Sequence, residues 1–178
     1  MWASFVEAEP DVVINNAEEL IAWGAEARSA EGGWSGYAKI GADIDLAGYA
    51  WEPVGTRQAP FAGLLDGGGH VISGLDVSDV ERAGLIGYAL GAQVRDLTVS
   101  GSISGTDSAG GIASWAESCT FERCANEASV SGVNYSGGIV GMAFGTVRLE
   151  ECVNRGNVEG GQSVAGIALE ASGWTDFP

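Results

Sequence analysis

Two stretches of the chain carry one pattern: CANEASVSG at Cys124–Gly132 and CVNRGNVEG at Cys152–Gly160. Each stretch begins with Cys and has Asn at its third position, Val at its seventh and Gly at its ninth. The two copies lie 28 residues apart. A fixed period of this length is the sequence signature of repeats that stack on one another. The pattern therefore predicts a solenoid.

A second, four-residue motif keeps the same repeat register over a longer part of the chain. It occurs as GLIG, GIAS, GIVG and GIAL, which start at Gly84, Gly111, Gly138 and Gly166. The steps between these starts are 27, 27 and 28 residues. Four further columns hold the register: Val94, Phe121 and Leu149; Leu97, Cys124 and Cys152; Ile103, Val130 and Val158; Gly105, Gly132 and Gly160.

A shorter and degenerate copy is predicted upstream of these repeats. Its anchor is Gly63–Asp66, which lies 21 residues before Gly84. In this alignment Ile72 and Leu75 match Val94 and Leu97.

Each repeat holds three short stretches of strand-like residues separated by turn residues. In the first full repeat they lie around the anchor, at Val94–Val99 and at Ser102–Ser104. Three strands in 21 to 28 residues leave no room for a helix, so each strand is expected to pair in parallel with its counterpart one repeat away. The fold class is therefore an all-β solenoid, specifically a right-handed parallel β-helix with three strands per rung. Tyr37–Leu46, which alternates apolar residues, is expected to form a strand of an initial rung.

The segment before the repeats predicts a helix that caps the solenoid. Asn16 and Glu19 form a capping box, and Gly32 and Gly33 end the helical pattern. The apolar side of this helix consists of Leu20, Ile21, Trp23 and Ala27. A solenoid exposes core side chains and strand edges at its ends, so the helix is placed over the first rung.

The chain is interpreted as one structural domain. An N-terminal strand and the capping helix occupy residues 1–36, and the β-helix occupies 37–178. The predicted repeats are about 63–83, 84–110, 111–137 and 138–165, with a partial repeat at 166–178. At the far end, either Trp174 and Phe177 cover the core or the native chain continues.

Composition narrows the classes of partner. The 178 residues carry 24 Asp plus Glu and 8 Lys plus Arg, a net charge of −16, which disfavours nucleic acid and anionic membrane surfaces. Mean hydropathy is +0.12 and no apolar run approaches the roughly 20 residues of a membrane helix, so a soluble folded protein is expected. The start of the chain lacks the features of a signal peptide.

The order of these motifs resembles the GLUG-motif family of bacterial surface proteins. The resemblance includes the AEELIAW helix, ADIDLAGYAWEPVG at Ala42–Gly55, LDGGGHVISGL at Leu65–Leu75, and the four-residue motifs followed by the Cys, Asn, Val and Gly columns. Such modules occur in secreted or wall-attached proteins, including adhesin-like proteins and non-catalytic regions of some IgA-specific metallopeptidases. The resemblance implies a β-helix and an extracellular location, and it implies no catalytic residue.

The cysteines and asparagines admit a structural and a functional interpretation. Cys124 and Cys152 share a column, so they are either a redox or metal pair or a stack of buried thiols. Cys119 lies five residues before Cys124, and a bridge between the two in an oxidising compartment is a less favoured alternative. Asn126 and Asn154 share the next inward column with Val99, and they are expected to form a structural amide ladder that tolerates left-handed backbone.

Charged residues form two outward columns. The columns are Asp96, Arg123 and Glu151, and Arg95, Glu122 and Glu150. A β-helix polysaccharide lyase would place stacked Asp and Arg with Ca²⁺ on such a face, but exposed opposite charges on adjacent strands are more often cross-strand ion pairs.

The only histidine and three carboxylates are the remaining polar candidates. His70 is either a turn residue or a general base oriented by Asp66. Asp43, Asp45 and Asp66 form either a Ca²⁺ site or part of a solvated strand face.

Aromatic residues supply a candidate glycan surface. Tyr88 and Trp115 share a column with Met142, and Tyr135 lies in a turn between rungs. Stacked rings either bind sugars through their flat apolar faces or form part of the core.

The function expected from the sequence is a non-catalytic, rigid structural or adhesive module that is secreted or displayed on a bacterial surface. Its partner would be a host or bacterial surface protein or a glycan, contacted by turns such as Thr106–Ser108 and Val133–Ser136. No cofactor is expected, with Ca²⁺ as the one candidate. The alternatives are a carbohydrate-binding module on the same scaffold and, less favoured, a polysaccharide lyase or hydrolase.

Overall fold

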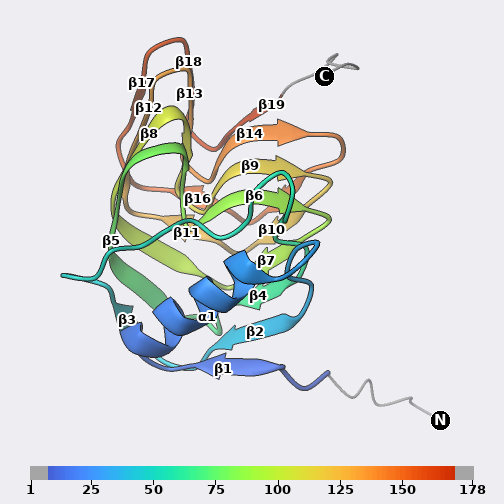
Figure 1. Ribbon diagram of the computed structural model, residues 1–178. Coiled ribbons are helices and arrows are strands. Elements are labelled where there is room, and N and C mark those ends of the chain that lie inside the picture. The colour runs from blue at the N-terminus through green and yellow to red at the C-terminus, as the bar shows by residue number, and fades with distance from the viewer. Residues whose placement is uncertain (1–7, 171–178) are drawn as a thin grey trace.

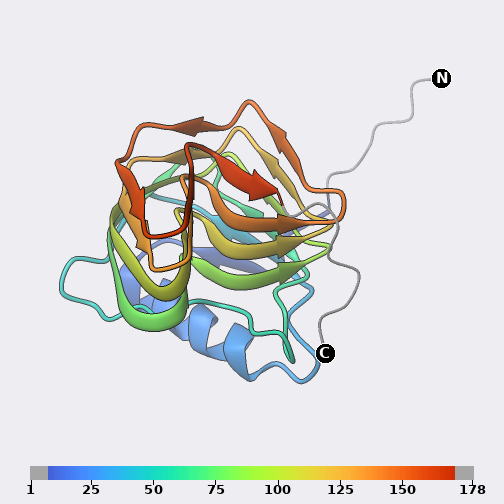
Figure 2. The same ribbon diagram turned by 90° about the horizontal axis from the view of Figure 1, so that it is seen from above.

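The computed structural model describes residues 8–170, which form a parallel β-solenoid with one helix (Figure 1). The strands build three sheets, and neighbouring strands within each sheet run parallel. In Figure 2, seen from the end where the last described strands lie, the chain runs counter-clockwise as it rises toward the viewer. The solenoid is therefore right-handed, and the predicted parallel β-helix is confirmed. Within the described residues, no helix is both long and apolar enough to span a membrane.

The first sheet supplies the strand with which each rung begins, and we number the rungs one to six accordingly. Its order is β1 (Val12–Ile14), β2 (Tyr37–Ile40), β4 (Leu64–Asp66), β7 (Gln93–Arg95), β10 (Thr120–Glu122) and β15 (Arg148–Glu150). Val94, Phe121 and Leu149 pair in register, as the sequence predicted.

The second and third sheets complete each rung. The second consists of β3 (Ile44–Asp45), β5 (Val71–Ala83), β8 (Thr98–Gly110), β11 (Ala125–Asn126), β12 (Ser129–Gly132), β13 (Tyr135–Gly137), β16 (Val153–Asn154), β17 (Val158–Gly160) and β18 (Ser163–Ala165). The third consists of β6 (Ile86–Leu90), β9 (Ala113–Glu117), β14 (Val140–Phe144) and β19 (Ala168–Glu170). The predicted columns of Ile103, Val130 and Val158 and of the three glycines after them pair in register.

The helix α1 (Ala17–Ser29) belongs to the first rung and follows β1. The Glu19 backbone N–H donates to Asn16 Oδ1 at 2.9 Å, which confirms the predicted N-cap. Leu20, Trp23 and Ala27 are buried in the same core cluster as the strands above them. Trp23 also packs edge-on against Phe61 of the next rung, so α1 covers the first end of the core.

Two predicted strands are each divided by a corner of the solenoid. Tyr37–Leu46 is β2 followed by β3, which lie in different sheets. Val94–Val99 likewise runs from β7 into β8, and the chain turns at Asp96, whose φ is 52°. These corners were missed because strand-like apolar residues continue on both sides of each corner.

The alignment of the short upstream copy was wrong. Gly63–Asp66 lies at the first sheet, where Leu65 pairs with Val94, whereas the GLIG anchor leads into β6 of the third sheet. Ile72 pairs with Val99 rather than with Val94. The counterparts of β6 in the preceding rung are bridges at Val54 and Phe61, and the chain between them loops out of the sheet. Because this inserted loop changes the spacing between repeats, the Gly63–Asp66 motif was aligned with the GLIG motif of a different sheet.

The expected covering of the far end by Trp174 and Phe177 lies outside the described residues.

Candidate functional site

The second sheet projects from the solenoid as a stack of arms (Figures 1 and 2). In the fourth rung the arm is the outer part of β8, and in the fifth and sixth rungs it is β12 with β13 and β17 with β18. In each arm one strand leads outward and the next returns, and both pair in parallel with the arm of the neighbouring rung. The arms therefore form a ridge along the solenoid.

Side chains at the arm tips form a hydrogen-bonded ladder, which we call the tip ladder. Asn134 Nδ2 donates to Asp107 Oδ1 at 2.7 Å, and Gln162 Nε2 donates to Asn134 Oδ1 at 2.9 Å. Backbone bonds between the same turns, such as Asn134 N–H to the Asp107 carbonyl at 2.8 Å, hold the ladder in register. Val133, beside it, is 58% exposed. The tips combine a fixed polar row with an exposed apolar side chain.

A shallow groove of about 450 Å³ follows the outgoing strands of three arms. It is lined by hydroxyl, carboxylate and glycine backbone groups of Ser104, Gly105, Ser131, Gly132, Val133, Glu159, Gly160 and Gly161. The glycines are required on the inner side, because a Cβ on Gly132 would lie 2.2 Å from the Tyr135 carbonyl oxygen of the returning strand.

The two charged columns lie where the first sheet turns into the second. Asp96, Arg123 and Glu151 all have φ near +50°, so they form the corner of their rungs. Arg123 Nε and Nη2 donate to the two carboxylate oxygens of Asp96 at 2.6 and 2.8 Å, and Arg123 also pairs with Glu122. The Asp96 pKa lies below its usual range because of this Arg123 pair, whose bonds outweigh burial. The left-handed backbone expected at the asparagines lies in this column instead.

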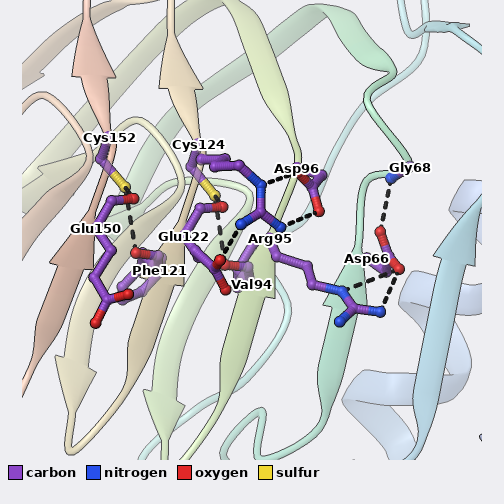
Figure 3. Close-up of polar contacts among 11 residues, drawn as sticks. Asp66, Gly68, Val94, Arg95, Asp96, Phe121, Glu122, Cys124, Glu150 and Cys152 are labelled. Atoms are coloured by element: carbon purple, nitrogen blue, oxygen red, sulfur yellow. Dashed lines mark hydrogen bonds and ion pairs between the residues drawn. The ribbon is translucent and has the colours of Figure 1, made fainter. Parts of the chain in front are cut away.

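Among residues 8–170, Asp66 is the one buried carboxylate of this face (Figure 3). Burial alone would raise its pKa, but a bond from the Gly68 N–H at 2.8 Å and two bonds from Arg95 lower it. Tyr37 adds its hydroxyl at 3.2 Å. Because these partners occupy the Asp66 carboxylate, we interpret Asp66 and Arg95 as a structural ion pair.

The remaining polar candidates have separate partners. His70 Nδ1 lies 3.1 Å from Asp43 Oδ1, so Asp43 rather than Asp66 orients the ring. Asp43 also accepts from the Val71 N–H, while Asp45 accepts from the Ala47 N–H. Within residues 8–170 no group of three or more His, Cys, Asp or Glu side chains is arranged to hold a metal ion.

All three cysteines are free thiols. Cys124 and Cys152 occupy matching corners of the fifth and sixth rungs, as predicted, with Cys124 buried and Cys152 half-buried. Cys119 precedes β10 and Cys124 follows it. The extended residues of that strand alone span roughly 10 Å, beyond the Cα separation of about 7 Å that a disulfide allows, so the alternative of a bridge between Cys119 and Cys124 is not realised.

The asparagine ladder is confirmed. Asn126 is fully buried and pairs in register with Val99 and Asn154. Its Nδ2 donates to Asn154 Oδ1 at 2.9 Å and to the Ala128 carbonyl at 3.0 Å, while its Oδ1 accepts from the Ala128 N–H. The side chain thus closes the backbone turn and joins two rungs.

The aromatic candidates form a stack on the third sheet. Tyr88 and Trp115 lie 6.2 Å apart at 17°, and Phe144 stacks on Trp115 at 4.5 Å and 19°. Because β9 lies between β6 and β14, the two rings lie on opposite sides of Trp115. The Arg82 guanidinium lies 4.9 Å from the Trp115 ring centre. Tyr135 lies elsewhere, in the arm strand β13.

Sequence reasoning missed some members of these clusters. Gln162 follows Asn134 by 28 residues and Asn134 follows Asp107 by 27, so the period would have revealed the tip ladder. Phe144 and Arg82 lie outside the Tyr88 and Trp115 column, and no periodic signal marks them.

Comparisons with known proteins identify the fold. No family model matches the chain, and no curated protein matches it. A solved structure of a "putative immunoglobulin A1 protease" from Bacteroides ovatus is similar at a TM-score of 0.63 and 24% identity. The similarity covers 89% of this chain and 61% of that protein. It shows a shared β-solenoid, and this chain corresponds to less than two thirds of the other protein.

Proposed function

We propose that the chain is a rigid, non-catalytic module of a secreted or surface-displayed bacterial protein, and that it presents its stacked arms to a partner. The observation that carries this proposal is the tip ladder of Asp107, Asn134 and Gln162. It includes the two turns, Thr106–Ser108 and Val133–Ser136, that the sequence singled out as contact points. Loops held by a rigid scaffold are the usual position of binding residues.

The partner we propose is a surface protein or a glycan of the host or of a bacterium. The net charge of −16 disfavours polyanions such as nucleic acids. The resemblance to GLUG-motif proteins and the protease name of the structural neighbour both suggest a larger extracellular protein. Immunoglobulin A1, which appears in that neighbour's name, is therefore a sensible first protein to test as a probe.

A sugar site on the aromatic stack is the alternative. It is supported by the association of Tyr88, Trp115, Phe144 and Arg82. Against it, a sugar ring binds best on a free aromatic face, and Trp115 already has Phe144 stacked on it at 4.5 Å and the Arg82 guanidinium over its ring at 4.9 Å. We therefore favour the arms over the stack.

The experiment compares binding and cleavage in one panel. The chain is immobilised and probed with a glycan array and with purified immunoglobulin A1. A double variant, Val133→Asp with Asn134→Ala, alters the tips, and Trp115→Ala disturbs the stack. Circular dichroism checks that both variants keep the sheet content. We expect the tip variant to weaken any binding about tenfold or more, the equivalent of one or two lost contacts, and Trp115→Ala to leave it unchanged.

Two results would contradict the proposal. Binding that Trp115→Ala abolishes and the tip variant retains would identify the stack as the site. Cleavage of the immunoglobulin heavy chain, or Ca²⁺-dependent release of unsaturated sugars from an acidic polysaccharide, would show an enzyme.

A further inference from the structure

The corner that joins the first and second sheets places Cys124 directly beside Cys152. The pairs on either side are in register, with Glu122 opposite Glu150 before the cysteines and Ala125 opposite Val153 after them. The Val153 N–H donates to the Cys124 carbonyl at 2.9 Å. Adjacent strands lie about 4.8 Å apart, and disulfides join residues whose Cα atoms are about 4.4 to 6.8 Å apart. The backbone therefore already has the separation of a disulfide.

The two side chains adopt the same orientation on their rungs (Figure 3). Cys124 Sγ lies 3.5 Å from the Val94 carbonyl oxygen of the rung below, and Cys152 Sγ lies 3.4 Å from the Phe121 carbonyl oxygen in the same way. Each thiol thus donates to a carbonyl oxygen of the rung below it. The sulfur atoms are stacked along the solenoid with no residue between them.

The two thiols differ in reactivity. The neighbouring Cys124 thiol lowers the pKa of Cys152 to about 7, although burial and the Glu122 carboxylate act in the opposite direction. The pKa of Cys124 is raised by the neighbouring Cys152 thiol and by burial. Since the thiolate is the nucleophile, Cys152, which is half-buried, is the group that reacts first. Burial raises the pKa of Cys119, and neither Cys124 nor Cys152 acts on that thiol.

We infer that Cys124 and Cys152 form a dithiol that small-molecule disulfides convert into a covalent bond between the fifth and sixth rungs. The Cys152 thiolate attacks one sulfur of the reagent R–S–S–R, which forms a mixed disulfide and releases one RS⁻. Cys124 then loses its proton and attacks Cys152 Sγ, which expels the second RS⁻. The two cysteine thiols are oxidised, and the reagent is reduced to two thiols. The bond fastens the sixth rung, where Leu149 and Val158 are only half-buried, to the fifth.

The test treats the native protein with 5,5′-dithiobis(2-nitrobenzoic acid). We expect one thionitrobenzoate anion for each member of the pair, no reagent retained on the protein, and an intact mass lower by two hydrogen atoms. Trypsin separates the three cysteines into peptides 96–123, 124–148 and 149–155. Non-reducing mass spectrometry should therefore show peptide 124–148 linked to 149–155, with the thiol of 96–123 still free.

Variants assign the two steps. Cys119→Ser should behave as the wild type does. Cys124→Ala should release a single anion and retain the reagent on Cys152, and Cys152→Ser should react no faster than Cys119 does in the folded wild type. The inference is overturned if the wild type retains the reagent on Cys152, or if Cys152 reacts as slowly as Cys119. The wild-type masses decide these outcomes even if a variant folds poorly.

Discussion

The fifth and sixth rungs carry the same columns of residues but bury them differently. Phe121 and Val130 of the fifth rung are at most 1% exposed, whereas Leu149 and Val158, their partners in the sixth, are half-buried. The fifth rung pairs with a neighbour on each side, while among the described residues the strands of the sixth pair only with the fifth. Membership of a column therefore sets the direction of a side chain, and the neighbouring rungs set its burial.

The largest difference between the rungs is expected in the glycine column of the arms. In Gly132→Ala the new Cβ would lie 2.2 Å from the Tyr135 carbonyl oxygen and 3.0 Å from the Ala109 nitrogen, both backbone atoms. We expect the free energy of unfolding to fall by about 3 kcal/mol or more. In Gly160→Ala the new Cβ would lie 2.6 Å from Ser136 Oγ, and its nearest backbone atom, the Gly132 carbonyl oxygen, would lie at 3.0 Å. Because a side-chain hydroxyl yields more easily than backbone, a smaller loss of about 1 to 2 kcal/mol is expected. Urea denaturation measures both, and equal losses would contradict the comparison.

The asparagine ladder should show a smaller difference in the same direction. Asn126→Ala leaves the buried N–H and carbonyl of Ala128 without their partner, and a loss of about 2 to 3 kcal/mol is expected. Asn154 makes the equivalent bonds to Gly156 at 3.1 Å, but it is half-buried and water can replace it. Asn154→Ala should therefore cost about 1 kcal/mol or less. Thermal unfolding of the two variants, with Asn126→Asp as a further control, tests this order.

The difference between a residue's repeat column and its actual neighbours also explains which parts of the molecule could be predicted from sequence. The columns of the fourth to sixth rungs were predictable because their period is nearly constant. Upstream, the loop between Val54 and Phe61 interrupts the third sheet, and a short motif then matched the wrong sheet. The corner at Arg123 was not predictable, because Arg does not indicate left-handed backbone, and Asp96, a residue type that tolerates it, lies within a strand-like run.

The candidate sites were less predictable than the fold, because the period does not report on contacts outside a column. Tyr88 and Trp115 were correctly placed together, but the covering of Trp115 by Phe144 comes from a residue two positions away from the shared column. The sequence suggested Asp66 as the partner of His70, and the structure has Asp43 instead, for a similar reason. Asp43 lies on the corner between β2 and β3, and that corner was predicted as continuous strand.

The smallest expected effect concerns the ion pairs at the two junctions. Between the fourth and fifth rungs, Arg123 donates two hydrogen bonds to Asp96. Between the fifth and sixth rungs, Arg155 Nη1 lies 3.7 Å from Glu127 Oε1. Because the folded pKa of Asp96 is depressed, its pair stabilises the protein above about pH 4, the unfolded value, and this contribution is lost as pH falls through the folded pKa.

Arg123→Met should therefore lower the urea midpoint at pH 6 and reduce its fall between pH 6 and pH 3. Arg123 and Asp96 are both partly exposed, so the loss of stability should be smaller than that of Gly132→Ala or Asn126→Ala. Arg155→Met is the matched control. At pH 6 it should lower the urea midpoint less than Arg123→Met does, because a single ion-pair contact at 3.7 Å is weaker than two charged hydrogen bonds. If the two variants lost equal stability, the difference between the junctions would lie in packing alone and not in their ion pairs.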